Sequence, residues 1–528
     1  MGLIVRPEPY VKDPDTPLLR VSPVDTINGR DACGAIHFWG GIGGGKSSSA
    51  AWVAGAYLRA MMGGCATATK IEDIELWKSY STKHGRGNSL VLVDGVNETF
   101  NFLDYLLATQ GMEGVGTVVE SLMRIIDAAR KSSPDASHGG GESPFWRDAT
   151  LEALRYTIPP LYRADGSVSI PAILRFVVSA PKSRAEAAGK EWKERSFMYE
   201  KLVRAVPKVA MEEWALENAC RFWSEKWADM DERTRSNVTS TITATLDRFN
   251  HGRLNRMFCH RTTVVPELSY GGVVQLLACP TTLWGDDAVI AQQLYKFIWQ
   301  KAVLSRNALK PQNRERFVFL WSDEAQDLVN SYDYEFLSLC RSSRCCVCFL
   351  TQSLPTYTAK MGDRNARDAA MALAGKFMTH VFCSNSCPET NEFAAKMLGR
   401  VMTRRGTYSK GTSKSFNEGM SAGNSENSGS SSSYGSSYGK GGGMSSNSGS
   451  NSGSGTNWGA NRGKGTSRNE SIGFNEGLEY AIEPGDFGRM LKTGGTRNGR
   501  EVTAVWYQAG RVFRESGTNW VLARFGQL

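Results

Sequence analysis

Residues 40–47 read Gly40-Gly41-Ile42-Gly43-Gly44-Gly45-Lys46-Ser47 and fit the pattern G-x-x-x-x-G-K-[ST]. A loop that wraps a chain of phosphates must point successive backbone N–H groups inward, which requires positive φ angles and no side-chain bulk. The glycines of this stretch meet both requirements. A lysine and a hydroxyl group at the end of such a loop suit the β- and γ-phosphates and Mg²⁺, respectively. The stretch therefore predicts a phosphate-binding loop.

The flanking residues supply the strand and the helix that such a loop requires. Ile36, Phe38 and Trp39 predict a buried strand before the loop, and the alanine-rich residues 47–62 predict a helix after it. The N-terminus of that helix adds partial positive charge beneath the phosphates. A flexible glycine-rich turn is the alternative interpretation, but it does not explain this context. The expected nucleotide-binding residues are Gly40, Gly41, Gly43, Gly44, Gly45, Lys46, Ser47 and Ser48.

A second stretch supplies acidic groups. The apolar residues 317–321 are followed by Ser322 and the acidic pair Asp323-Glu324. Because ligands of open α/β sheets bind at the carboxyl ends of strands, this pair is expected to face the loop. We expect Ser47 to bind Mg²⁺, Asp323 to hold the metal through water, and Glu324 to act as general base toward the attacking water. A solvated acidic loop is the alternative.

A third apolar strand, residues 345–351, ends in Gln352. A polar amide at this position suits a sensor that hydrogen-bonds the γ-phosphate or the attacking water. Arg341 and Arg344 precede the strand, and either arginine can reach a neighbouring subunit's site to stabilise charge on the leaving phosphate. A surface ion pair is the alternative role for each arginine. The expected catalytic residues are Lys46, Glu324, Arg341 and Gln352.

The order of the expected elements predicts the fold class. Strands alternate with helices on both sides of a long helical stretch, which indicates an α/β fold with a mostly parallel sheet and an inserted all-α domain. A later tract contains mainly Ser and Gly, and it has too few apolar residues to fold, so we expect disorder there. The expected parts are an N-terminal extension (1–34), the first part of a P-loop NTPase core (35–133), the inserted all-α domain (134–250), the second part of the core (251–405), the Ser/Gly-rich flexible tract (406–470) and the C-terminal part of the core (471–528).

Five tryptophans fall on the expected helices of the insertion. They are Trp146, Trp192, Trp214, Trp223 and Trp227. Packing between helices is the favoured interpretation of these residues, and stacking on nucleic-acid bases is the alternative.

Composition limits the compartment and the partners. The 528 residues carry a formal net charge of +9, which favours a polyanionic partner only weakly. The chain has no long uncharged apolar run, and residues 1–20 lack the apolar core of a signal peptide, so we expect a cytoplasmic protein, with peripheral docking at the inner membrane as the alternative. The 11 cysteines are expected to be reduced, and a zinc site at Cys383 and Cys387 is the less favoured alternative.

Several of these stretches together resemble a known family. Residues 323–327, 339–355 and 388–391 are similar to the core of TraG/TraD-like type IV coupling proteins, the conjugative DNA-transfer ATPases of the FtsK/HerA superfamily. Residues 101–105, 145–146 and 483–495 also resemble segments of this family. The resemblance covers residues 18–400 and 478–528. It implies a RecA-like P-loop NTPase in which Lys46 and Ser47 bind the nucleotide, Asp323 and Glu324 serve metal and water, Arg341 is the finger that acts in trans, and Gln352 is the sensor.

The resemblance also implies a function and partners. It implies an ATP-hydrolysing ring, usually a homo-hexamer, that translocates DNA and whose all-α domain receives DNA-processing partners such as a relaxase. Membrane-anchored members begin with transmembrane helices, which this sequence lacks, so direct coupling to a secretion channel is open. A soluble genome-packaging ATPase of a virus or mobile element is one alternative function. A nucleotide-gated assembly protein with incidental hydrolysis is another. A GTPase is less favoured because no Asn-Lys-x-Asp motif appears.

Overall fold

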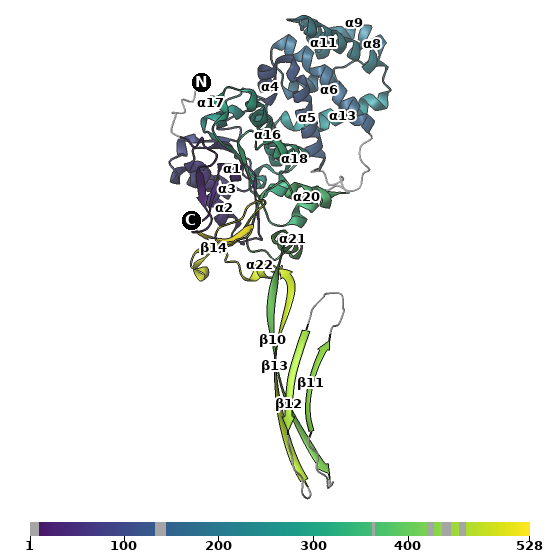
Figure 1. The fold of residues 1–528 in the computed structure, drawn as a ribbon. Coiled ribbons are helices and arrows are strands. Elements are labelled where there is room, and N and C mark those ends of the chain that lie inside the picture. The colour runs from purple at the N-terminus through teal and green to yellow at the C-terminus, as the bar shows by residue number, and fades with distance from the viewer. Residues whose placement is uncertain are drawn as a thin grey trace. The chain divides into compact units, whose positions relative to one another are not determined.

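The computed structural model describes residues 10–131, 144–361, 365–419, 427–435, 445–453 and 461–527. The chain forms two units, residues 1–390 with 487–528, and residues 391–486. The first unit is built on a nine-stranded sheet with the order β15-β14-β9-β3-β8-β7-β4-β6-β5 (Figure 1). Its strands are β3 (Ile36–Trp39), β4 (Gly63–Thr67), β5 (Leu90–Val93), β6 (Val274–Leu277), β7 (Val318–Ser322), β8 (Cys345–Thr351), β9 (Thr379–Phe382), β14 (Glu501–Gln508) and β15 (Trp520–Gly526).

All neighbouring strands between β9 and β5 in the sheet order pair in parallel. β14 pairs antiparallel with β9 and with β15. Strands β3, β4, β6, β7 and β8 are buried along their whole length. Continuous burial is expected for parallel strands, because helices cover both faces of such a sheet. The predicted α/β class with a mostly parallel sheet is therefore confirmed.

The direction of each crossover decides which face its helix covers. The chain moves from β3 to β4 and on to β5 in one direction along the sheet, and it moves back from β6 to β7 and β8 in the other. Because parallel crossovers are right-handed, the two sets of helices lie on opposite faces. Figure 1 shows α2 (Lys46–Arg59) and α3 (Ile71–Lys83) on one side of the sheet, and α16 (Asp286–Ser305) and α18 (Ser331–Leu339) on the other.

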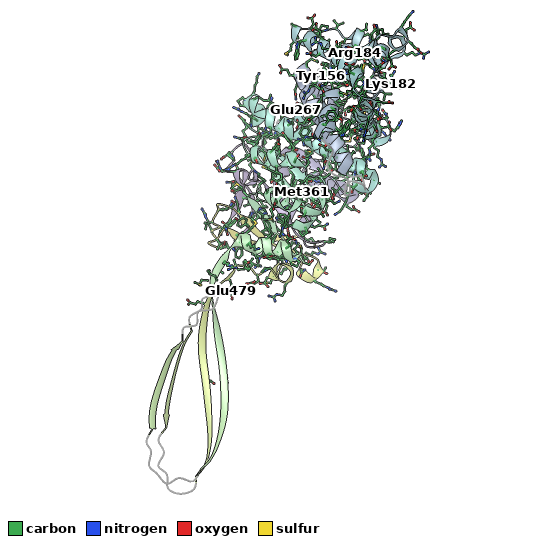
Figure 2. The ribbon with its side chains drawn as sticks, turned by 90° about the vertical axis from the view of Figure 1, so that its right-hand side faces the viewer. Tyr156, Lys182, Arg184, Glu267, Met361 and Glu479 are labelled. Atoms are coloured by element: carbon green, nitrogen blue, oxygen red, sulfur yellow. The ribbon has the colours of Figure 1, made fainter. Side chains whose placement is uncertain are left out.

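The segment between β5 and β6 has helices joined by loops as its regular elements among the described residues, and they extend beyond the expected insertion at 134–250 on both sides. Its α-helices are α4 (Phe102–Gln110), α5 (Val115–Lys131), α6 (Pro144–Asp165), α7 (Ile170–Val178), α8 (Arg184–Ala188), α9 (Lys190–Arg195), α10 (Phe197–Arg204), α11 (Ala210–Arg221), α12 (Trp227–Asp229), α13 (Glu232–Leu246) and α14 (Gly252–Phe258). Figure 2 labels Tyr156 on α6, Arg184 on α8 and Lys182 in the short segment before α8. Trp223 and Trp227 pack in their core, as favoured, but Trp214 is 68% exposed.

Two further strands were not anticipated from the sequence. β1 (Pro17–Arg20) and β2 (Thr26–Asn28) form an antiparallel pair in the expected N-terminal extension. β4 was also missed because its sequence, Gly-Gly-Cys-Ala-Thr, has little β propensity. A Cβ at Gly63 or Gly64 would lie within 2.4 Å of a backbone oxygen, so the close packing of neighbouring backbone, rather than propensity, explains this strand.

The second unit contains the Ser/Gly-rich tract, and here the structure differs from the expected disorder. β10 (Arg400–Gly419) pairs antiparallel with β13 (Asn461–Tyr480), and β11 (Asn427–Gly435) pairs antiparallel with β12 (Ser445–Gly453). Such pairing satisfies backbone N–H and C=O groups without an apolar core, so the lack of apolar residues does not prevent it.

Candidate functional site

The loop at residues 40–45 joins β3 to α2 and requires glycine at specific positions. Gly43 and Gly45 have φ angles of 68° and 90°. A Cβ at Gly44 would lie 2.2 Å from the carbonyl oxygen of Ser384, and one at Gly45 would lie 2.6 Å from Cγ1 of Val502. The loop is therefore held from behind by the residues that follow β9 and by β14, and larger residues do not fit there.

Lys46 is the first residue of α2, and its side chain folds back over the loop. Its Nζ donates hydrogen bonds to the carbonyl oxygens of Gly40 at 2.8 Å and Gly41 at 3.4 Å. Ser47 is exposed on the first turn of the same helix, and Ser48 is half-buried beside it. The lysine ammonium thus lies where the glycine loop and the helix N-terminus meet, which is the position that the sequence predicted for a phosphate ligand.

The acidic pair follows β7 at the same edge of the sheet. Asp323 is half-buried, and loss of hydration, then the carboxylates of Asp73 and Glu324, raise its pKa to about 6. Its Oδ1 accepts a hydrogen bond from the backbone N–H of Glu324 at 2.8 Å. Glu324 has a φ angle of 47°, in the left-handed region that non-glycine residues seldom adopt. This turn points the two adjacent carboxylates into one pocket.

Three side chains hold the Glu324 carboxylate. Lys70 Nζ lies 2.8 Å from its Oε1, Gln326 Nε2 donates to its Oε2 at 2.9 Å, and Gln352 Nε2 lies 3.3 Å from both oxygens. Burial raises the pKa of Glu324, but the hydrogen bonds from Lys70 and Gln326 and the charge of Lys46 outweigh it, so this pKa lies below its usual value. Glu324 is thus a charged, oriented carboxylate.

These groups share a pocket of about 470 Å³. It is lined by Ile42, Gly43, Lys46, Ser47, Thr69, Lys70, Thr281, Asp323, Glu324, Gln326, Asp327 and Gln352. The volume lies within the range of small-molecule sites. The structure thus brings together the predicted Lys46, Ser47, Asp323, Glu324 and Gln352.

Arg341 is not brought to this pocket within its own chain. It is exposed and lies before the amino end of β8, whereas Gln352 follows the carboxyl end of that strand. Its guanidinium has no hydrogen bond or ion pair with any residue that the structure describes. Arg344 differs, because its Nη1 donates to the carbonyl oxygens of Lys12 at 2.7 Å and Glu315 at 2.8 Å. Of the two arginines, Arg341 is therefore the one whose guanidinium no described residue holds.

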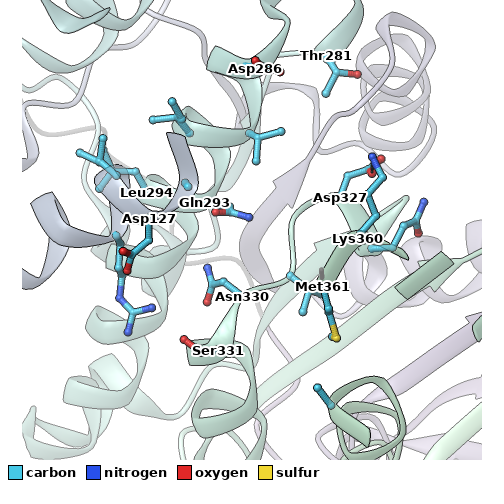
Figure 3. Close-up of a pocket in the computed structure, with 18 of the residues that line it drawn as sticks. Asp127, Thr281, Asp286, Gln293, Leu294, Asp327, Asn330, Ser331, Lys360 and Met361 are labelled. Carbon is cyan, nitrogen blue, oxygen red and sulfur yellow. Dashed lines mark ion pairs between the residues drawn. The ribbon is translucent and has the colours of Figure 1, made fainter. Parts of the chain in front are cut away.

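A larger cavity of about 1160 Å³ adjoins the pocket and shares Thr281, Gln326 and Asp327 with it. Figure 3 shows Lys360 and Asp327 together on one side of this cavity and Asp127 on the other. Lys360 belongs to α19 (Leu354–Met361), and its Nζ lies 2.9 Å from Oδ1 of Asp327. The cavity is therefore bounded both by the core and by α5 of the helical insertion.

Sequence reasoning missed Lys70, Gln326 and Thr281. Lys70 and Thr281 follow β4 and β6, whose carboxyl ends lie at the same edge of the sheet as that of β7. Recognition of β4 as a strand would have placed Lys70 at this edge. Gln326 lies two residues after Glu324, and that proximity was a usable signal.

Comparison with known proteins gives a family match and a fold. Residues 317–457 match the family model described as the TraM recognition site of TraD and TraG. The bacterial conjugative coupling protein TrwB in its unbound form is similar, with a TM-score of 0.52 at 14% identity, covering 98% of this chain and 90% of that chain. TrwB with ADP and Mg²⁺ gives a TM-score of 0.52, and TrwB with the GTP analogue GDPNP gives 0.53, both at 13% identity and the same coverage.

No curated protein matches the sequence. The structural likeness confirms the RecA-like P-loop NTPase fold, and the family match confirms the resemblance to TraG/TraD-like coupling proteins over residues 317–457. No described helix of this chain has the length and apolar character needed to cross a membrane.

Proposed function

We propose that this chain is an ATP-hydrolysing motor of the type IV coupling protein kind, which assembles as a ring and translocates DNA in conjugative transfer. One observation carries the proposal. Lys46 and Ser47 from α2, the Asp323-Glu324 pair after β7 and Gln352 after β8 line a single pocket. A nucleotide-gated switch needs only groups that bind the nucleotide, such as Lys46 and Ser47. Hydrolysis also needs an oriented carboxylate, and here that carboxylate lies beside a glutamine.

The residues of the pocket fit ATP and Mg²⁺. The Ser47 hydroxyl and the Asp323 carboxylate offer oxygen ligands, which Mg²⁺ prefers, and the metal commonly takes only one or two protein ligands beside the phosphates. Bound Mg²⁺ would neutralise charge on the phosphate oxygens. Solved structures of TrwB contain ADP with Mg²⁺ and the ATP analogue ADPNP, which supports the same pair of ligands here.

Hydrolysis follows from the placement of the side chains. The water oxygen forms a bond to the γ-phosphorus as the bond from that phosphorus to the β–γ bridging oxygen breaks, which yields ADP and phosphate. Glu324 takes the proton of the water, Gln352 orients the water or the phosphate, and Lys46 stabilises charge on the phosphate oxygens. The glycine loop binds the phosphates through its backbone N–H groups.

Arg341 supports the proposed ring. An exposed arginine remote from its own pocket can complete the site of a neighbouring subunit, and such an arginine stabilises charge in the transition state. A homo-hexamer with DNA in its centre is the arrangement that the family resemblance implies. TraG and TraD, by the description of their family model, carry a TraM recognition site in the region that matches residues 317–457, which supports a DNA-processing partner for this chain.

Steady-state hydrolysis of ATP and of GTP, each measured with no DNA, with single-stranded DNA and with double-stranded DNA, tests the proposal. Strong stimulation of ATP hydrolysis by either DNA supports the motor. Slow turnover that DNA does not change contradicts it and favours the assembly protein. Stimulation by the DNA of a viral or mobile-element genome only together with a packaging partner would favour the packaging ATPase.

A further inference from the structure

Lys70 is the one cation that contacts Glu324 among the described residues, and no family motif in the sequence pointed to it. Its Nζ lies 2.8 Å from Oε1 of Glu324, and its side chain is 52% exposed whereas that of Glu324 is 9% exposed. Both residues line the pocket that also contains Lys46 and Ser47. The pocket therefore presents two lysine side chains from different elements.

The backbone of Lys70 is held at the start of α3, and its half-exposed side chain extends into the pocket. Lys70 caps the N-terminus of α3, and Oδ2 of Asp73 accepts hydrogen bonds from the backbone N–H of Lys70 at 2.9 Å and that of Thr69 at 3.0 Å. Asp73 itself is buried. The side chain thus starts from a well-anchored backbone at the pocket wall.

The ion pair of Lys70 with Glu324 is weak enough to be exchanged. The lysine end of the pair is half-exposed, so water screens its charge and weakens its attraction to the carboxylate. A terminal phosphate offers more negative charge and several acceptor oxygens, so it competes effectively with one carboxylate for the ammonium group. Glu324 would still be held by the amides of Gln326 and Gln352, so its orientation does not depend on Lys70.

We propose that Lys70 is a second cation for the terminal phosphate of the nucleotide and that it engages Glu324 only until that phosphate arrives. The inference rests on the proposed function, since it assigns Lys70 to the same nucleotide site. Lys70 then has two consequences. It makes the pocket prefer a triphosphate to a diphosphate, and it leaves Glu324 free to accept a proton only when a γ-phosphate is present.

The test compares binding of a non-hydrolysable ATP analogue and of ADP to the full chain and to Lys70→Met and Lys70→Arg. Lys70→Met is expected to weaken binding of the ATP analogue by about tenfold, the effect of one charge-assisted hydrogen bond, and to change ADP binding by less than about twofold. Lys70→Arg keeps the charge and should restore part of the loss. Lys78→Met is the matched control, because Lys78 lies on α3 and pairs with Glu75 outside the pocket.

A second experiment tests the competition between Glu324 and the terminal phosphate for Lys70. Glu324→Gln removes the carboxylate that holds Lys70, so it should tighten binding of the ATP analogue, and this gain should disappear in the double variant with Lys70→Met. Equal binding of the ATP analogue by the wild-type chain and Lys70→Met would overturn the inference and leave the proposed function intact. Failure of the wild-type chain to bind either nucleotide would overturn both.

Discussion

The side-chain nitrogen of Gln352 lies 3.3 Å from both carboxylate oxygens of Glu324. The two residues follow β7 and β8, which are adjacent and parallel, so the carboxyl ends of these strands meet at one edge of the sheet. The amide nitrogen of Asn385 donates to the backbone carbonyl of Gln352 at 3.0 Å, which fixes the position of the glutamine. The pair therefore forms a rigid unit facing the phosphate-binding loop.

Glu324→Gln is expected to retain ATP binding and to lower turnover by at least about a hundredfold, because an amide cannot accept the proton of the water. Phosphate release and binding of a fluorescent ATP analogue measure the two properties separately. Glu75→Gln, on the exposed surface of α3, serves as the control. Unchanged turnover in Glu324→Gln would remove this residue from the mechanism.

Arg341→Ala is expected to abolish hydrolysis in the pocket of the neighbouring subunit and to leave the pocket of its own chain intact. In mixed rings with Lys46→Ala, some interfaces combine an intact lysine site with an intact arginine, so part of the activity should return. Titration of one inactive variant into the other, followed by ATPase measurement, gives the result. Absence of any recovery in rings shown to be mixed would argue against a role in trans.

Gly44→Ala is expected to impair nucleotide binding strongly, because its Cβ would lie 2.2 Å from the carbonyl oxygen of Ser384 and would displace the loop. Gly41→Ala is the matched control, since the nearest atom to its Cβ would be 3.8 Å away. Titration of both variants with the ATP analogue compares them. Equal affinity in the two variants would show that the packing behind the loop does not support binding.

Deletion of residues 407–469 is expected to leave basal ATPase activity within about twofold of the full chain. The deleted residues belong to the unit at 391–486, whereas all the pocket residues belong to the other unit. The ATPase rate without DNA, together with the melting temperature, checks this expectation. Lost activity in a folded deletion variant would make the tract part of the motor.

Stability is expected to fall between about pH 6.5 and about pH 4 because of His380. This residue is buried, accepts a hydrogen bond at Nδ1 from Trp39 Nε1 at 3.0 Å, and has its pKa lowered by burial to about 4. As the pH falls, the unfolded chain binds a proton at this histidine before the folded chain does. Each pH unit in this window therefore lowers the free energy of unfolding by roughly 1.4 kcal/mol.

His380→Gln should be less stable near neutral pH but should lose less stability on acidification. Thermal unfolding of both proteins at about pH 7 and about pH 5 measures the difference in slope. The buried His37 contributes in the same direction in both proteins, since its pKa is also lowered by burial and then by His380. If the stability of the two proteins depended on pH with the same slope, other groups would be responsible for the loss of stability in acid.

Much of the site could be predicted because its chemistry lies in short contiguous stretches. The loop at 40–47, Asp323 and Gln352 each come directly after, or one residue after, an apolar run whose length suits a buried strand. Since parallel strands end at a common edge, their placement in one pocket followed from the fold class alone.

The remaining residues depend on contacts that are distant in sequence. Lys70 follows a strand made of Gly-Gly-Cys-Ala-Thr, which forms because β6 and β7 pair with it on either side. The packing of Val502 behind Gly45 joins residues separated by most of the chain. Neither relationship has a local signal, so neither is visible without the three-dimensional arrangement.

The position of β14 has a consequence for synthesis. The loop glycines emerge from the ribosome early, but Val502, which packs against Gly45, emerges 457 residues later. At about 5–20 residues per second, that delay is on the order of a minute. Nascent chains that stop before Glu501 leave β9 as an unpaired sheet edge and the loop unsupported. The support behind the loop is therefore complete only in a chain translated through this hairpin.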